Sequence, residues 1–393
     1  MIITFLKIEQ GEKLYFVKIR LINYRNFLNI SIDFDSNLNI FIGNNAQGKT
    51  NILEAMTMLV RGASYKTNND KQLINWDNNI SYLFGEISKN DEIFKVNISL
   101  EKEVESLNKI KLIKVIKINQ NRLSKSILSK EFKGVVFSPE HLQIIKGSPS
   151  LRRKFLNEQI SQIYPLYQRY LSEYERILGH RNNILRRSDN RREARESLLI
   201  WDPQLIKRGS FLILTRIKFL KKMNYLANKF YQDITKGKEN LKISYQSNVI
   251  EDLKEEKLSL ILEAFKNKIE RYKEKELDYK TTLYGPHRDD FLVSINNANV
   301  AFYGSQGQQR TSILSLKLGE LDLIKEREGV YPVLLLDDVM SELDEERRHF
   351  LLNLIINKKV QTFITSINLN YFNNDIMKKG KIFKVEAGKV SVL

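Results

Sequence analysis

The sequence contains no cysteine, and this absence excludes several kinds of site at once. A disulfide scaffold, a zinc ribbon, an iron–sulfur cluster and a thiol nucleophile all require cysteine. The 4 histidines lie far apart along the chain, which argues against a histidine-based metal cluster. No apolar run approaches the roughly 18 residues of a membrane span, and four charged residues within the first 14 positions exclude a signal peptide. We therefore expect a cytoplasmic protein without a membrane partner.

Positive charge is what the sequence has in excess. The 393 residues are 42% hydrophobic and 28% charged, an ordinary globular balance for two or three domains. The net charge of +17 favours a polyanionic partner, such as nucleic acid or an anionic membrane surface. Residues 151–240 hold 20 Lys and Arg against 9 Asp and Glu. The alternative interpretation of this segment is a solvated basic helix face.

Hydrophobic periodicity predicts β-rich ends and a helical middle. Strand-like patterns occupy residues 15–42, 112–118, 281–295, 333–336 and 360–365. Helical spacing is found in residues 51–60, 149–163, 166–185, 205–229, 253–272 and 313–324. Ser148 with Pro149 is typical of a helix start, and the segment 119–121 is typical of a hairpin turn. The middle of the chain is thus expected to be a helical arm set into a β-rich protein.

Residues 43–50 match the P-loop pattern G-x-x-x-x-G-K-[ST], between a predicted strand and a predicted helix. Such a loop wraps phosphate oxygens with backbone N–H groups at the positive end of the helix. In this pattern the lysine neutralises the β and γ phosphates of the nucleotide, and the hydroxyl residue ligates Mg²⁺. The predicted ATP-binding residues are Gly43, Asn44, Asn45, Ala46, Gln47, Gly48, Lys49 and Thr50.

The apolar strand 333–336 ends in Asp337 and Asp338, which is the Walker B arrangement. Asp337 is expected to hold Mg²⁺ together with Thr50, and Asp338 to orient or deprotonate the attacking water. Lys49 and Asp338 are therefore the candidate catalytic residues. Because 288 residues separate Lys49 from Asp337, small GTPases and nucleotide kinases fit poorly.

A second phosphate-binding element precedes the Walker B strand. Ser305, Gln306 and Gly307 open a predicted helix and offer N–H groups, a hydroxyl and a helix N-terminus. This element has no obvious role in its own subunit, so we interpret it as an ABC-type signature motif that meets the nucleotide of a facing subunit. Asp344, in the segment 341–344, then falls where that class has its D-loop.

Together these motifs resemble the RecF family of bacterial gap-repair ATPases, which is related to the heads of structural-maintenance-of-chromosomes (SMC) proteins. The similarity extends from about residue 15 through nearly the whole chain. It rests on residues 25–27, 43–51, 137–142, 146–153, 285–290, 305–311 and 336–344. The expected fold is an α/β, two-lobed ABC-type head. Its ATPase lobe comprises residues 1–150, with the P-loop, and 281–393, with the signature, Walker B and D-loop segments; a basic helical lobe, 151–280, is inserted.

The resemblance also implies a function. It implies ATP and Mg²⁺ as ligands, an ATP-dependent homodimer, and DNA binding at gaps or single-strand/double-strand junctions as well as on duplex. It further implies cooperation with RecR and RecO in loading RecA, in the nucleoid. ABC-type motors usually carry Glu where Asp338 stands, so DNA-dependent ATP hydrolysis is expected to be slow. Two alternatives are an ABC transporter subunit, disfavoured by the long basic insertion, and an ATP-switched structural DNA clamp without useful turnover.

Several positions depart from the family pattern. Residues 1–14 precede its usual start, as a dispensable extension or a misassigned start. Lys66 stands where Arg is usual and cannot make the same forked phosphate contact. The position of the switch histidine falls near Thr365 and Ser366, so proton transfer by histidine is not expected there. For the Q-loop, the candidates are Ser138 and Glu140, with Gln143 weaker. His287, within residues 285–290, is expected to be structural.

Overall fold

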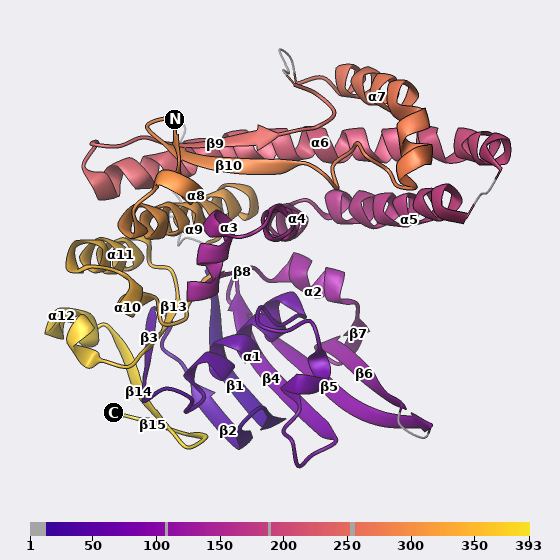
Figure 1. Ribbon diagram of the computed structural model, residues 1–393. Helices are drawn as coiled ribbons and strands as arrows, with labels where there is room; N and C mark the ends of the chain where they lie inside the picture. The colour runs from indigo at the N-terminus through magenta and orange to yellow at the C-terminus, as the bar shows by residue number, and fades with distance from the viewer. Residues whose placement is uncertain (1–12, 107–108, 188–189, 252–255) are drawn as a thin grey trace, which may run out of the picture. The chain divides into compact units, whose positions relative to one another are not determined.

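The computed structural model describes residues 13–393, except 107–108, 188–189 and 252–255 (Figure 1). The expectation about residues 1–14 therefore falls almost entirely outside the described residues. The chain forms two compact units: the first comprises residues up to 141 together with 320–393, and the second comprises 142–319. The expected inserted lobe, 151–280, lies within the second unit, which extends further at both ends. As a result, the signature segment belongs to the second unit and the Walker B strand to the first.

The first unit contains an antiparallel sheet of six strands in the order β2-β1-β4-β5-β6-β7. Its strands are β1 (Leu14–Tyr24), β2 (Phe27–Asp33), β4 (Ile80–Lys89), β5 (Glu92–Ser106), β6 (Lys109–Ile118) and β7 (Asn121–Leu123). Asn119 and Gln120 join β6 to β7 with positive φ angles of 47° and 73°, as a two-residue hairpin turn requires. This turn was predicted from the sequence.

A second six-stranded sheet in this unit has the order β15-β14-β3-β13-β12-β8. The strands are β3 (Leu38–Ile42), β8 (Gly134–Phe137), β12 (Val333–Leu336), β13 (Thr362–Ser366), β14 (Gly380–Glu386) and β15 (Lys389–Val392). All are parallel except β15, and β3 lies between β13 and β14. Because parallel strands end at the same edge, the loops after β3, β12 and β13 converge.

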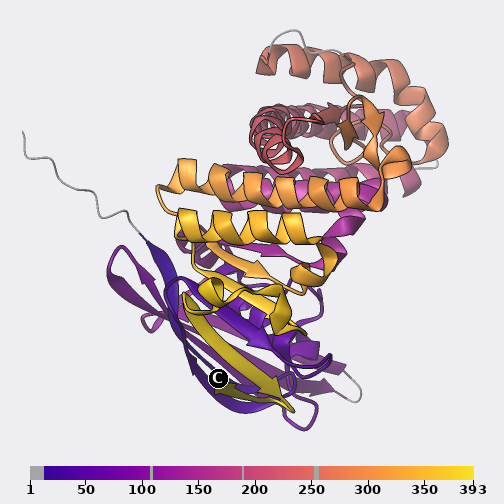
Figure 2. The same cartoon turned by 90° about the vertical axis from the view of Figure 1, so that its left-hand side faces the viewer.

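Helix α1 (Lys49–Arg61) contacts strands of both sheets, and its apolar residues belong to their shared core (Figures 1 and 2). Ten of its 13 residues are buried, which is why the segment has apolar side chains on nearly every face. The other helices here are η1 (Asp70–Leu73), α2 (Lys125–Glu131), η2 (Pro139–Leu142), α10 (Val339–Glu342), α11 (Glu345–Lys358), η3 (Leu369–Tyr371) and α12 (Asn374–Met377). Burial of α1 thus fixes the P-loop that precedes it.

The second unit is mainly helical. Its helices are α3 (Gln143–Lys146), α4 (Pro149–Ile163), α5 (Pro165–Arg187), α6 (Arg191–Thr235), α7 (Leu258–Tyr279) and α8 (Val300–Tyr303). A small antiparallel sheet joins β11 (Ala298–Asn299), β10 (Asp290–Ile295) and β9 (Leu241–Gln246). Helix α9 (Gln306–Glu328) begins in this unit and ends in the first. None of the described helices is long and apolar enough to cross a bilayer.

The helical pattern is confirmed in outline and wrong in detail. The helix start at Pro149 is correct. The helix expected over 205–229 is part of the longer, 45-residue helix α6, which also contains Pro203. The strand expected over 281–295 is wrong for its first part, because only 290–295 form β10. Residues 281–289 instead form turns, where Asp289 accepts hydrogen bonds from Tyr245 at 2.5 Å and from the Asn248 backbone at 2.9 Å.

Candidate nucleotide site

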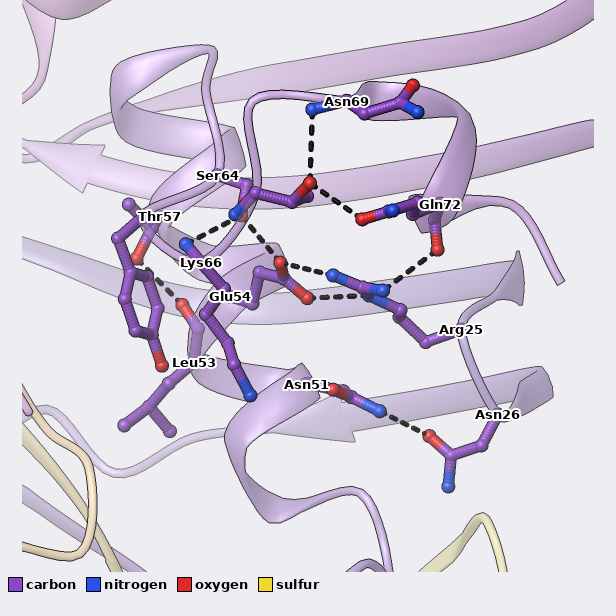
Figure 3. Close-up of polar contacts among 12 residues, drawn as sticks. Arg25, Asn26, Asn51, Leu53, Glu54, Thr57, Ser64, Lys66, Asn69 and Gln72 are labelled. Atoms are coloured by element: carbon purple, nitrogen blue, oxygen red, sulfur yellow. Dashed lines mark hydrogen bonds and ion pairs between the residues drawn. The ribbon is translucent and has the colours of Figure 1, made fainter. Parts of the chain in front are cut away.

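The loop between β3 and α1 requires glycine at two positions, Gly43 and Gly48. A Cβ on Gly43 would lie 2.2 Å from the backbone oxygen of Val385 on β14. Gly48 has a φ of 115° at the N-cap of α1. Asn26 also holds the loop, because its amide donates to the Gln47 carbonyl at 2.9 Å. Its oxygen accepts from the Asn51 amide at 2.8 Å (Figure 3).

Lys49 turns back over its own loop. Its ammonium group donates to the carbonyl oxygens of Gly43, at 2.6 Å, and Asn44, at 2.8 Å. Burial lowers its pKa, against the opposing attraction of Asp338 and Asp337. The side chain is therefore held within the loop, where its positive charge could pair with a bound phosphate group.

Asp337, directly after β12, lies at the centre of the site and is only 4% exposed. Its Oδ1 accepts hydrogen bonds from the hydroxyls of Thr50, at 2.8 Å, and Thr365, at 2.9 Å. Its Oδ2 accepts one from the Tyr65 hydroxyl at 2.8 Å. Burial and the adjacent negative charge raise the pKa of Tyr65, which keeps its phenol as the donor. The structure thus joins the P-loop to the Walker B strand through a hydroxyl and a carboxylate.

Asp338 has an unusual backbone and an unpartnered oxygen. Its φ is 51°, in a region that few residues other than glycine occupy, and its N–H donates to the Thr365 hydroxyl at 2.8 Å. Its buried Oδ1 has no hydrogen-bond partner within the described part of the chain. Burial raises the pKa of this carboxyl, and the charge of Asp337 acts in the same direction. An unpartnered carboxylate oxygen at this position is suited to a bound water.

These residues fit a magnesium ion. A threonine hydroxyl and a carboxylate are oxygen ligands of the kind that Mg²⁺ prefers, and Mg²⁺ usually keeps several waters. Thr50 and Asp337 supply that pair, and the orphaned Oδ1 of Asp338 is a further oxygen nearby in sequence. When bound with ATP, the ion would neutralise charge on the phosphate oxygens.

A partly buried ion pair holds the segment next to the site. The Arg25 guanidinium donates to both carboxylate oxygens of Glu54 on α1, at 2.7 and 2.8 Å, and also to the Gln72 carbonyl at 2.9 Å (Figure 3). The Glu54 side chain is fully buried. The Ser64 hydroxyl donates to the same carboxylate at 2.5 Å and accepts from the Lys66 backbone N–H at 2.9 Å. This network fixes the segment that carries Tyr65. In Figure 3 the Lys66 side chain extends toward the first turn of α1.

The signature segment is described within the second unit alone. Ser305 and Gln308 form reciprocal bonds at the start of α9: Ser305 N donates to the Gln308 side chain at 2.9 Å, and Gln308 N donates to the Ser305 hydroxyl at 3.1 Å. Ser305 and Gln306 are exposed and Gly307 is partly exposed. The expected N-terminal position at a helix is therefore present.

The other predicted positions have different surroundings. Asp344 caps its own helix, α11, by accepting from the Arg347 backbone at 2.9 Å. Ser138 bonds to His141, whereas no side-chain contact within the described ranges singles out Glu140 or Gln143 as a Q-loop residue.

The structural role expected for His287 agrees with the geometry. Its Nδ1 lies 2.6 Å from the Tyr174 hydroxyl and its Nε2 lies 3.2 Å from the Thr282 carbonyl. Burial lowers its pKa to about 4, so the ring is neutral at neutral pH.

Sequence reasoning missed two residues that contact Asp337. Thr365 was noted only as the place of an absent histidine, and Tyr65 was not singled out. The signal for Thr365 was its position at the end of a strand parallel to β12. Nothing local marked Tyr65, because its contact spans 272 residues.

Comparison with known proteins agrees with this geometry. The family model described as the RecF/RecN/SMC N-terminal domain matches residues 15–391. The DNA replication and repair protein RecF of Clostridium kluyveri is 43% identical over 379 residues, covering 96% of this chain and 100% of that protein. RecF of Halothermothrix orenii is 39% identical over 382 residues, covering 96% of this chain and 99% of that protein.

Solved structures agree with the sequence comparisons. The structure of the recombination mediator protein RecF with ATP in the RecFOR pathway has a TM-score of 0.86 and 35% identity, covering 98% of this chain and 99% of that one. An SMC head domain from Pyrococcus furiosus has a TM-score of 0.53 at 12% identity, covering 97% of this chain and 96% of that one, and shows the shared fold alone.

Proposed function

The chain belongs to the RecF family and has the ABC-type ATPase fold of RecF and SMC heads, and from this we propose that it is an ATP-switched DNA-binding protein of recombinational repair. The observation that carries the proposal is the hydrogen bond between Thr50 and Asp337, which joins the P-loop to the Walker B carboxylate. A solved relative that carries ATP supports the choice of nucleotide.

Residues 43–50 bind the ATP phosphates, with the N–H groups at the start of α1 and the Lys49 ammonium as donors. Thr50 and Asp337 hold Mg²⁺. Phosphate oxygens would replace the carbonyls of Gly43 and Asn44 as partners of Lys49, so the lysine keeps its hydrogen bonds while gaining a charged partner.

Asp338 is the proposed general base. Its unpartnered Oδ1 accepts a proton or a hydrogen bond from the attacking water. A raised pKa makes a carboxylate a stronger base, and a positioned base contributes typically 10²–10⁴-fold to the rate. Because Asp is one methylene shorter than Glu, its reach is shorter and hydrolysis is slow.

The signature residues Ser305, Gln306 and Gly307 complete the nucleotide site of a second copy of the chain, and Asp344 lies at the same interface as its D-loop residue. Their exposure, and the capped start of α9, support this role in trans. ATP then closes a homodimer and hydrolysis opens it.

DNA is the proposed partner of the closed dimer, on duplex and at gaps or single-strand/double-strand junctions, with the basic residues of 151–240 among its contacts. RecR, RecO and RecA are the proposed protein partners, in the cytoplasm at the nucleoid. A solved relative that is named as a recombination mediator in the RecFOR pathway supports this assignment.

The test is phosphate release measured with and without DNA, alongside light scattering with and without ATP. We expect slow release that DNA stimulates, and a change from monomer to dimer with ATP. Dimerisation without any release would favour the structural clamp. No ATP-dependent change in mass would contradict the proposed switch.

A further inference from the structure

The buried Walker B carboxylate, Asp337, accepts its side-chain hydrogen bonds from hydroxyl groups. Thr50, Thr365 and Tyr65 donate to Asp337, and no ammonium or guanidinium group does so in the described ranges of the chain. Thr50 belongs to the P-loop and Thr365 to the end of β13, so both contacts come from the nucleotide edge of the sheet. The third donor, Tyr65, comes from the segment between α1 and η1.

Tyr65 restricts a rotation of the Asp337 carboxylate that the two threonines do not restrict. Both threonines bond to Oδ1, and Tyr65 is the donor to Oδ2. The terminal torsion of an aspartate is broad and roughly two-fold, so a carboxylate held by one oxygen can rotate. A donor on each oxygen fixes the plane of the carboxylate and directs Oδ1 toward Thr50.

The segment that presents Tyr65 is itself fixed. The Ser64 hydroxyl donates to Glu54 at 2.5 Å and accepts from the backbone N–H groups of Lys66 and Thr67, at 2.9 and 3.1 Å (Figure 3). Glu54 is held in turn by the paired bonds from Arg25. A chain of contacts therefore runs from Arg25 through Glu54 and Ser64 to the residue beside them, Tyr65, and ends on Asp337.

We propose that Tyr65 is a positioning residue that sets the Mg²⁺ requirement of nucleotide binding, by holding the Asp337 carboxylate in the orientation that the metal needs. The inference rests on the proposed function, because it concerns the same site. Groups that orient a metal ligand through hydrogen bonds typically contribute 10–100-fold to metal affinity. The hydroxyl of Tyr65 acts on Asp337 in this way, without contacting the nucleotide itself.

The test is a titration of Mg²⁺ against binding of a fluorescent ATP analogue, with EDTA as the baseline, for the parent, Tyr65→Phe and Tyr82→Phe. Tyr82 is the matched control because it lies on β4 and is 39% exposed. For Tyr65→Phe we expect the half-maximal Mg²⁺ concentration to rise about tenfold, with unchanged binding in EDTA. Tyr82→Phe should match the parent. Thermal unfolding of each variant reports its folding separately.

A Tyr65→Phe variant with lowered thermal stability and a parent-like Mg²⁺ midpoint would overturn the inference, because the hydroxyl would then be merely structural. Ser64→Ala provides a second variant if Tyr65→Phe does not fold. It keeps the phenol and removes the tie to Glu54, so the midpoint should rise by a smaller factor; an unchanged midpoint would again overturn the inference. A parent that binds no ATP in Mg²⁺ would overturn the proposed function as well, which distinguishes the two failures.

Discussion

The hydroxyl of Thr50 donates a hydrogen bond to Oδ1 of Asp337 at 2.8 Å, although 287 positions separate the two residues. The contact forms because β3 and β12 are parallel strands of one sheet, with β13 between them, and both loops leave the same edge. Segments far apart in the chain therefore bring together a hydroxyl and a carboxylate, the pair that we propose holds Mg²⁺.

Lys49→Met should abolish ATP binding and ATP-dependent dimerisation together, because the proposed cradle loses its only lysine. Ser305→Arg should leave ATP binding intact and block the dimer, because the signature segment is proposed to act on the nucleotide of a second copy. Nucleotide binding by fluorescence and mass by light scattering distinguish the two variants. Loss of ATP binding in monomeric Ser305→Arg would show that the assignment in trans is wrong.

Asp338→Asn keeps the size of the side chain and removes the base. Single-turnover hydrolysis should fall at least about tenfold, a threshold below the usual range for a general base, while ATP-driven dimerisation persists. Asp337→Asn is the contrast, since it should weaken Mg²⁺-dependent binding as well. If Asp338→Asn hydrolyses ATP at the parent rate, the base lies elsewhere.

The arginines at the end of α5 and the start of α6 should differ in their effect on DNA binding. Arg191 bonds to Asp278 at 2.7 Å and Arg192 to Glu196 at 3.1 Å, so part of their charge is already balanced. Arg186 and Arg187 are exposed and have no ion pair among the described residues. Each phosphate contact adds about −0.9 to the slope of log K against log salt.

Reversing the charges of Arg186 and Arg187 should therefore flatten the slope by up to about 2, and reversing Arg191 and Arg192 should flatten it less. Duplex binding over a series of salt concentrations measures both, with ATP binding as the control. Equal effects from the two pairs would contradict this distinction.

His287 should make stability depend on pH in a defined window. Its pKa is lowered to about 4 by burial, against about 6.5 in an unfolded chain. Above about pH 6.5 the ring is neutral in both states and contributes no pH dependence. Between about pH 6.5 and about pH 4 the ring is protonated in the unfolded chain but stays neutral in the native protein. The free energy of unfolding therefore falls as pH falls, by up to about 3 kcal/mol.

Urea unfolding of the parent and of His287→Gln between about pH 7 and about pH 5 tests this dependence. Glutamine cannot take up the proton, so the parent should lose more stability than the variant as pH falls. A difference between the two proteins that stays constant over the range would count against the assignment.

The sequence predicted those parts of the fold and site that local pattern controls. The P-loop, the Walker B strand and the helix start at Pro149 each follow from residue types within a few positions of one another. The family resemblance supplied the ABC-type architecture that these fragments imply.

What the sequence could not predict depends on contacts between distant segments. β9 was missed although Leu241–Gln246 alternate apolar and polar residues, and its partner β10 lies more than 40 residues further along the chain. The basic surplus of 151–240 was interpreted as surface charge, yet Arg181 and Arg216 are buried, at 0% and 2% exposure. Arg181 pairs with Glu276 at 2.5 Å and Asp202 at 2.8 Å, and no periodicity reveals such partners. Part of the positive charge therefore stabilises the second unit and is unavailable to DNA.

The position of β3 between β13 and β14 has a consequence for synthesis. A ribosome delivers β3 early, but both strands that pair with it come from residues 362–386. Until then the strand that leads into the P-loop has two open edges, which are prone to pair with other chains. A nascent chain released before residue 362 would lack the support that shapes the loop. Such truncated products should not bind nucleotide, and they should be bound by chaperones or degraded by proteases. A chain that binds nucleotide is therefore one whose translation has passed this point.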